Sequence, residues 1–127
     1  METLISFKRY YISEGIERTL ATNHLGSFLL TGLLLDKLLA QDHPVRIVFL
    51  NTNIIGRKCE LDFDDLNAES RKKYDGFEVY KQSKLAAAMF ARELSERLKE
   101  AAVSMQKMPE ANEQPAGGRS WTRLWLW

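Results

Sequence analysis

A single strand-like run between two long helical stretches limits what this chain can fold into. The segment VRIVFLN, residues 45–51, contains four consecutive apolar residues at 47–50. This pattern is typical of a strand covered on both faces in the middle of a parallel sheet. The one other candidate is LISF, residues 4–7, which is a weak strand at best. Because a covered strand takes its backbone hydrogen bonds from neighbours on both sides, the sequence predicts part of a sheet and not a complete one.

Apolar residues recur at spacings of three and four in both long stretches. The first, EGIERTLATNHLGSFLLTGLLLDKLLAQD, is apolar around much of its circumference and ends before Pro44, so we expect a largely buried helix. Gly26 and Gly32 each cost this helix roughly 1 kcal/mol relative to Ala, which favours a close approach by another backbone. The second helix is predicted from about Gly76 to about Glu100, with an apolar side made by Leu85, Met89, Phe90, Leu94 and Leu98.

Composition excludes several classes of function. The 127 residues suffice for one domain, and the formal net charge of +1 gives no electrostatic footprint for nucleic acid. The most apolar run, residues 25–35, is shorter than a membrane span. The single cysteine, Cys59, excludes an internal disulfide and a cysteine-rich zinc site, and favours an intracellular location. We therefore predict neither a nucleic-acid partner nor a membrane span.

Two polar segments carry weaker signals. Asp62, Asp64 and Asp65 in DFDDLN are predicted to cap a turn or short helix, since a cation site would need more ligands at regular spacing. Residues 101–127 are rich in polar residues, proline and glycine and end in WTRLWLW, so we expect a flexible tail.

The chemistry of the second helix centres on YKQSK, in which Tyr80 and Lys84 stand at positions i and i+4. Side chains at this spacing share a helix face. An ammonium near a phenol favours the phenolate and lowers the tyrosine pKa, which suits proton transfer to or from an alcohol oxygen. Taken alone, the same spacing also arises from ordinary pairs on amphipathic helices.

The order of the phrases NHLGSFLLT, RIVFLNTN, LDFDDLN and YKQSKLAAAMFARELSERL resembles the central part of the short-chain dehydrogenase/reductase family, in its retinol-dehydrogenase-like branch, over about residues 15–100. The resemblance implies an α/β fold: a fragment of a Rossmann-type doubly wound parallel sheet, mostly two long helices around one central strand. It implies a partial domain at residues 1–100, without the glycine-rich nucleotide-binding half, and a divergent tail at 101–127.

The resemblance also implies roles for individual residues. Tyr80 falls on the catalytic tyrosine and Lys84 on the lysine that binds the nicotinamide ribose and lowers the tyrosine pKa. Asn23 matches the asparagine that holds a water in a proton relay, so that all three residues are expected at the cofactor. The family's serine after the central strand is replaced here by Asn51 and Thr52. Thr52 is expected either to polarise the substrate carbonyl in place of that serine or to form a local strand-end turn.

The implied cofactor is NADP or NAD, and the implied substrate is a small carbonyl or alcohol such as a retinoid or similar lipid. Seven glycines are present, but they form no glycine-rich phosphate-binding motif. The sequence therefore leaves two hypotheses. One is a short-chain oxidoreductase, truncated and weakly active or inactive as this chain. The other is a non-catalytic family remnant that acts through helix-mediated association, as a homo-oligomer formed through the two long helices.

Overall fold

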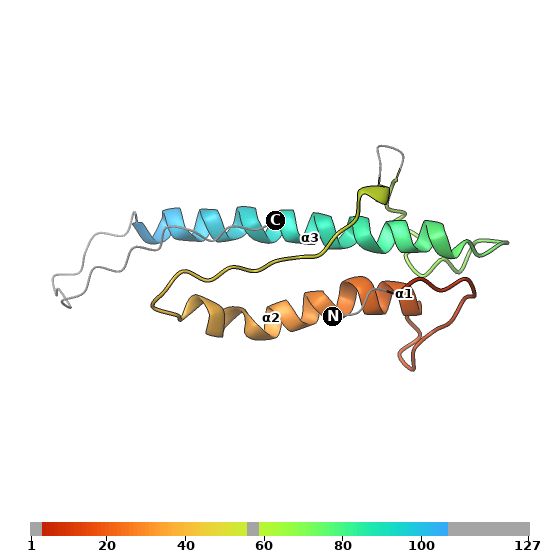
Figure 1. Cartoon of the computed structure of the whole chain (residues 1–127), viewed down its shortest axis with the longest axis horizontal. Helices are drawn as coiled ribbons and strands as arrows, with labels where there is room; N and C mark the ends of the chain where they lie inside the picture. The colour runs from red at the N-terminus through yellow and green to blue at the C-terminus, as the bar shows by residue number, and fades with distance from the viewer. Residues whose placement is uncertain (1–3, 56–58, 107–127) are drawn as a thin grey trace.

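Two helical rods lying side by side make up more than half of the described residues (Figure 1). The structure is a computed structural model, and it describes residues 4–55 and 59–106. The first rod joins α1 (Arg18–Leu20), a π-helical turn η1 (Ala21–Leu25) and α2 (Gly26–Leu39). The second is α3 (Gly76–Gln106), and a 3-10 turn, η2 (Asn53–Ile55), precedes it. The rods run in the same direction, because the segment after α2 returns along α3 (Figure 1).

The predicted first helix is present at 18–39, and a carboxylate sets its start. Glu17 is its N-cap, and the Glu17 carboxylate accepts a hydrogen bond from the Leu20 N–H at 2.8 Å. The apolar pattern predicts that the helix starts at Glu14, and the observed start lies four residues later, at Arg18. The π-helical turn inside this rod has no signal in the apolar spacing.

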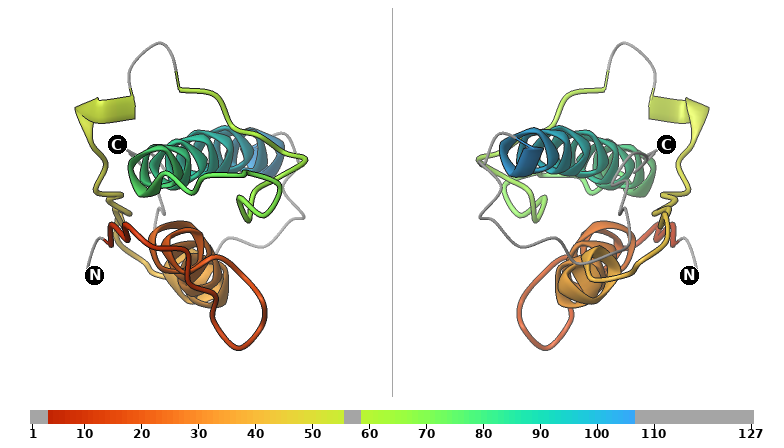
Figure 2. Two further views of the ribbon diagram at one scale, coloured as in Figure 1. Left: turned by 90° about the vertical axis from the view of Figure 1, so that its right-hand side faces the viewer. Right: turned by 90° about the vertical axis from the view of Figure 1, so that its left-hand side faces the viewer.

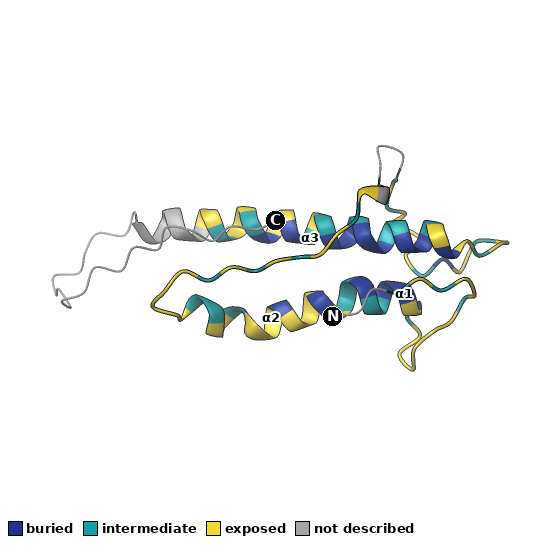
Figure 3. Cartoon of the chain, in the orientation of Figure 1, coloured by how far each residue is buried: buried dark blue, intermediate teal, exposed yellow. Residues whose placement is uncertain are grey.

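The expectation that this helix is largely buried is wrong for the described structure. Its buried side is a narrow stripe of mostly small or polar residues, among them Asn23, Ser27 and Thr31. Five of its large apolar side chains are exposed by 40–70%: Phe28, Leu29, Leu30, Leu33 and Leu34. Figure 3 shows buried positions where the rods face each other and exposed positions along α2. Phe28 contacts the Phe90 ring of α3, with the ring centroids 4.7 Å apart, whereas Leu29 and Leu33 stay 61% and 70% exposed in the described part of the chain.

A close approach of two backbones occurs at Gly76 and not at the two glycines of the first helix. A Cβ at Gly32 would meet no described atom within 4 Å, and one at Gly26 would meet only the Ala21 carbonyl, in the same rod. A Cβ at Gly76 would lie 1.9 Å from the Ser6 carbonyl oxygen. The expectation for Gly26 and Gly32 is therefore wrong, and the segment around Ser6 packs directly on the start of α3.

The predicted second helix is confirmed, and it continues to Gln106. The Asp75 carboxylate begins it by accepting from the Phe77 N–H at 2.9 Å. Its inner face is built largely from alanines, with Ala86, Ala87 and Ala91 buried beside Leu94, whereas Met89 is 45% exposed. The remainder of the predicted tail, residues 107–127, lies outside the described residues.

The segment at residues 45–51 forms no strand among the described residues. It runs along α3 as an irregular chain, with Val48 and Leu50 exposed by 68% and 76% (Figures 1 and 2). The physical reason is that a strand needs at least one hydrogen-bonded neighbouring strand, and the described part of the chain supplies none. The two helices of the predicted α/β arrangement are present, and the sheet between them is not formed in this part of the chain.

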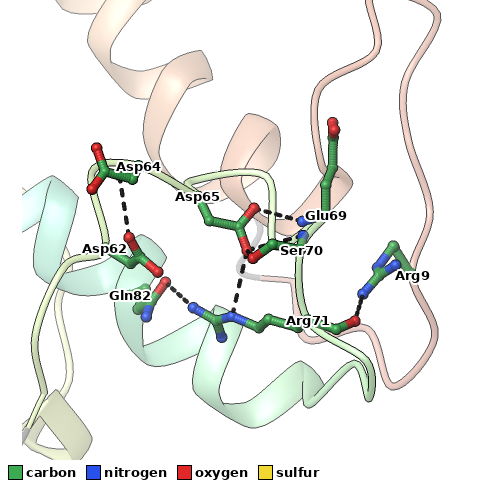
Figure 4. Close-up of polar contacts among 8 residues, drawn as sticks. All are labelled: Arg9, Asp62, Asp64, Asp65, Glu69, Ser70, Arg71 and Gln82. Carbon is green, nitrogen blue, oxygen red and sulfur yellow. Dashed lines mark hydrogen bonds and ion pairs between the residues drawn. The ribbon is translucent and has the colours of Figure 1, made fainter.

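The loop before α3 is organised by Asp65, which confirms the predicted capping role of that residue. Its carboxylate accepts from the Glu69 N–H at 2.7 Å and from the Ser70 hydroxyl at 2.5 Å, and the latter bond is the main cause that lowers the Asp65 pKa. Figure 4 shows Arg71 beside this carboxylate and donating to Gln82 of α3 at 3.0 Å. The loop is thereby tied to the YKQSK turn.

None of the helices in the described ranges combines the length and apolar character that crossing a bilayer requires.

Candidate active site

Tyr80 and Lys84 lie one turn apart on the buried side of α3. Tyr80 is 7% exposed and Lys84 is 5% exposed. The Tyr80 ring lies 6.5 Å from the Phe77 ring, between centroids, and its hydroxyl makes no hydrogen bond within the described part of the chain. The helix therefore places a phenol and an amine on one largely buried face, as the spacing predicts.

Lys84 joins this turn to the segment at residues 45–51. Its Nζ donates to the Leu50 carbonyl at 3.3 Å, and its own backbone carbonyl accepts from the Asn51 amide at 3.3 Å. Burial lowers the pKa of Lys84, because removing the ammonium from water disfavours the charged form. The amine thus sits at the junction of α3 and the predicted strand.

Asn23 contributes its side chain from the opposite side, in the π-helical turn η1. Its Oδ1 accepts from the Leu4 N–H at 2.8 Å, and its Nδ2 donates to the Leu4 carbonyl at 2.8 Å and to the Ser83 hydroxyl at 3.0 Å. Both hydrogens of the amide are therefore used within the protein. The relay role of Asn23 stays a prediction, and in this structure its amide ties the segment at Leu4 to α3.

Thr52 is half-buried and follows the residue that contacts Lys84. Its backbone N–H donates to the Asn51 side-chain oxygen at 2.9 Å, a local turn of the kind that the sequence also allowed. Its role as a polarising donor stays a prediction.

A pocket of about 420 Å³ lies between α2, α3 and the segment at 45–51. Lys84 and Asn23 line it together with apolar residues such as Leu34 and Ile47, whereas Tyr80 and Thr52 are not among its lining residues. The structure therefore brings Tyr80, Lys84 and Asn23 together around one turn of α3 but does not place all of the predicted site residues in one cavity.

The residues present fit only one end of a nicotinamide dinucleotide. The Tyr80 phenol and the Lys84 amine suit the hydroxyls of the nicotinamide ribose. The pyrophosphate ordinarily lies at a glycine-rich turn and a helix N-terminus. The N-termini of α1 and α3 are instead occupied by the carboxylates of Glu17 and Asp75, which would repel a phosphate. The chain thus supplies candidate groups for proton transfer, and none of its described residues builds a pyrophosphate site.

Sequence reasoning assigned no role to Ser83, although it lies within YKQSK. Its side chain is fully buried, with 0% exposure, and bonds both Asn23 and the Tyr80 carbonyl. The only signal in the sequence was its position immediately before Lys84. Its partner Asn23 lies 60 residues away, so spacing could not reveal the contact.

Comparison with known proteins gives consistent relatives. The chain is 45% identical over 97 residues to retinol dehydrogenase 13 of Homo sapiens, a match that covers 75% of this chain and 28% of the relative. It is 44% identical over 85 residues to human retinol dehydrogenase 14, covering 67% of this chain and 24% of the relative. It is 37% identical over 118 residues to retinol dehydrogenase 11 of Mus musculus, covering 91% and 35%.

No protein-family profile matches the chain. No solved structure matches it either. The curated relatives are much longer, because the matches to retinol dehydrogenases 11, 13 and 14 span between 24% and 35% of their lengths. The similarity nevertheless agrees with the ordered phrases around Asn23 and Tyr80. The chain therefore belongs to the retinol-dehydrogenase-like branch of the short-chain dehydrogenase/reductase family.

Proposed function

We propose that this chain carries the proton-transfer residues of an NAD(P)-dependent oxidoreductase that interconverts a carbonyl and an alcohol, with a retinoid or a similar apolar molecule as substrate. The observation that carries the proposal is the buried turn of α3, where Tyr80 and Lys84 are anchored by neighbouring segments on both sides. The names of the relatives support the reaction class and the substrate class.

Tyr80 is the acid and base of the proposed reaction. In reduction its phenol gives a proton to the substrate oxygen, and in oxidation the phenolate removes one from the alcohol. Lys84 stabilises the phenolate electrostatically and, with Tyr80, holds the ribose hydroxyls of the cofactor. A bound nicotinamide supplies or accepts the hydride, so that one hydride and one proton convert the carbonyl to the alcohol. Asn23 is proposed to support the cofactor end, and Thr52 to donate to the substrate oxygen.

The test is turnover and cofactor binding by the full chain. We expect saturable NADPH or NADH binding only at millimolar concentration, because no glycine-rich turn contributes phosphate contacts. With all-trans-retinal as substrate, Tyr80→Phe should lower the rate by about 100-fold or more, since general acid catalysis contributes factors of this size. Tyr11→Phe is the matched control, because Tyr11 is 43% exposed and lies in another segment; its rate should stay at the wild-type value.

Two results would contradict the proposal. The first is the absence of saturable cofactor binding, measured by calorimetry or by nicotinamide fluorescence up to millimolar concentration. The second is a Tyr80→Phe variant that turns over as fast as Tyr11→Phe.

A further inference from the structure

Ser83 lies between Tyr80 and Lys84 in sequence, and both of its hydrogen-bonding roles are used. Its hydroxyl donates to the Tyr80 carbonyl at 2.7 Å and accepts from the Asn23 amide at 3.0 Å. The Ser83 side chain is fully buried, with 0% exposure, as are those of Glu17 and Thr19. It therefore connects the turn that carries the phenol to a different helix.

The position of the Asn23 amide is itself fixed. Leu4 lies 19 residues before Asn23 and Ser83 lies 60 residues after it, and the one amide bonds both. Because the amide group is planar, its paired bonds to the Leu4 N–H and carbonyl set the direction of its remaining N–H. That N–H points at the Ser83 hydroxyl, so the contact has a defined geometry.

The Tyr80 carbonyl links the Ser83 hydroxyl to the backbone of both Tyr80 and Lys84. In an α-helix the carbonyl of residue i accepts from the N–H of residue i+4, which here is the N–H of Lys84. A serine hydroxyl that donates to a carbonyl in the preceding turn competes for the same oxygen and changes the local bend of the helix. Ser83 therefore acts on the one peptide group that joins Tyr80 and Lys84 within the turn.

We propose that Ser83 is a positioning residue that sets the relative orientation of the Tyr80 phenol and the Lys84 amine through the Tyr80 carbonyl. The proposal deepens the proposed function and rests on it. Leu50 and Asn51 hold Lys84 from the other side. Loss of the Ser83 hydroxyl thus removes the hydrogen bond to Asn23 and leaves the contacts of Lys84 with Leu50 and Asn51. We expect Tyr80 and Lys84 to shift relative to each other while the helix remains folded.

The experiment compares Ser83→Ala with Thr31→Val in the full chain. Thr31 is a matched control, because it is buried on the neighbouring helix and its hydroxyl donates to the Ser27 carbonyl at 2.7 Å. Ser83→Ala removes a buried hydroxyl, and Thr31→Val replaces one with a methyl group of similar size. Ser83→Ala should lower kcat by about 10-fold with little change in KM, since a small misplacement of catalytic groups can cost up to about 100-fold. Thr31→Val should leave kcat unchanged.

A second measurement needs no turnover. The titration of the Tyr80 phenol is followed by ¹³C NMR of its Cζ, assigned by the signal missing in Tyr80→Phe. Ser83→Ala should shift the titration midpoint, and Thr31→Val should not. An inactive wild-type chain would remove the proposed function, and the titration would still decide the role of Ser83.

Ser83→Cys guards against a variant that does not fold, because the thiol leaves no cavity, although its sulfur is larger than the hydroxyl oxygen, and is a weaker hydrogen-bond partner. It should shift the titration in the same direction as Ser83→Ala. If Ser83→Ala or a folded Ser83→Cys gives the wild-type titration midpoint, the positioning role is wrong.

Discussion

His24 is held among aromatic rings, where its charged form is disfavoured. Its ring centroid lies 6.1 Å from that of Phe28 and 6.3 Å from that of Phe90. Its Nδ1 is buried and has no hydrogen-bond partner in the described part of the chain. Burial lowers the pKa of His24 from its ordinary value of 6.5. His24 therefore contributes to stability in its neutral form.

This pKa shift predicts how stability depends on pH. Below about pH 6.5 the unfolded chain binds a proton at His24 more readily than the folded chain does, so the free energy of unfolding should fall as the pH is lowered. Carboxylates also line the pocket beside His24, at Asp64, Asp65 and Glu69, so the measurement stays above pH 5. Urea unfolding followed by circular dichroism between pH 5 and 8 measures the slope.

The matched variants for that measurement are His24→Phe and His43→Gln. His24→Phe removes the titrating group and should flatten the dependence on pH. His43 is exposed and pairs with Asp42, so His43→Gln should keep the wild-type slope. If the free energy of unfolding of His24→Phe depends on pH as strongly as that of the wild type, another titrating group causes the dependence.

The N-terminal segment and α3 meet at a position where only glycine fits. A Cβ at Gly76 would lie 1.9 Å from the Ser6 carbonyl oxygen and 3.1 Å from the Phe7 Cα. The same segment is fixed at Leu4 by Asn23. The segment around residues 4–7 therefore packs on the start of α3 at Ser6 and is held by hydrogen bonds at Leu4.

Gly76→Ala and Gly32→Ala should have opposite effects on the free energy of unfolding. Gly76→Ala forces a backbone apart and should destabilise the chain by about 1–3 kcal/mol, the usual cost of overpacking. Gly32→Ala places a methyl group in space that no described atom occupies within 4 Å, and it should stabilise the helix by about 0.5–1 kcal/mol. Urea unfolding gives both values. Amide exchange at Leu4 should accelerate only in Gly76→Ala, and equal effects of the two substitutions would contradict the close packing at Gly76.

The helices could be predicted from sequence because their backbone hydrogen bonds lie within each helix. The conformation of the segment at 45–51 could not be predicted in this way. The spacing of apolar residues locates α3 and the rod at 18–39, since each helix pairs its own backbone groups. A strand depends on neighbours elsewhere in the chain, so the apolar run at Ile47 did not determine its structure. The π-helical turn at Asn23 also lacked a signal, because apolar periodicity does not register a single widened turn.

The candidate site divides in the same way. The pairing of Tyr80 with Lys84 on one face follows from their spacing within a single helix. The contacts of Asn23 with Leu4 and Ser83 join segments that are far apart in sequence, and no local pattern predicts them. Sequence therefore identified the groups that we propose to handle the proton, and the structure was needed to find which residues hold them.

The buried core of the whole molecule is small and lies where α1 and η1 face α3. Of the eight buried hydrophobic residues in the described ranges, four are alanines. The other four are Leu20, Val79, Tyr80 and Leu94. The apolar side of α2 contributes little to this core, because Leu33 is 70% exposed. The stability of the chain therefore depends on a few large side chains between the two rods.

Leu94→Ala and Leu33→Ala test which large side chains stabilise the chain, with the same substitution at a buried site and at an exposed one. Leu94 is 8% exposed, so its truncation should cost about 2–4 kcal/mol through lost burial and the cavity that it leaves. Leu33→Ala should change the free energy of unfolding by less than about 0.5 kcal/mol, as surface substitutions usually do. Urea unfolding at low protein concentration keeps association from contributing. Equal losses at both positions would mean that the apolar side of α2 is covered in solution, and the core would then be larger than the contact between the two rods.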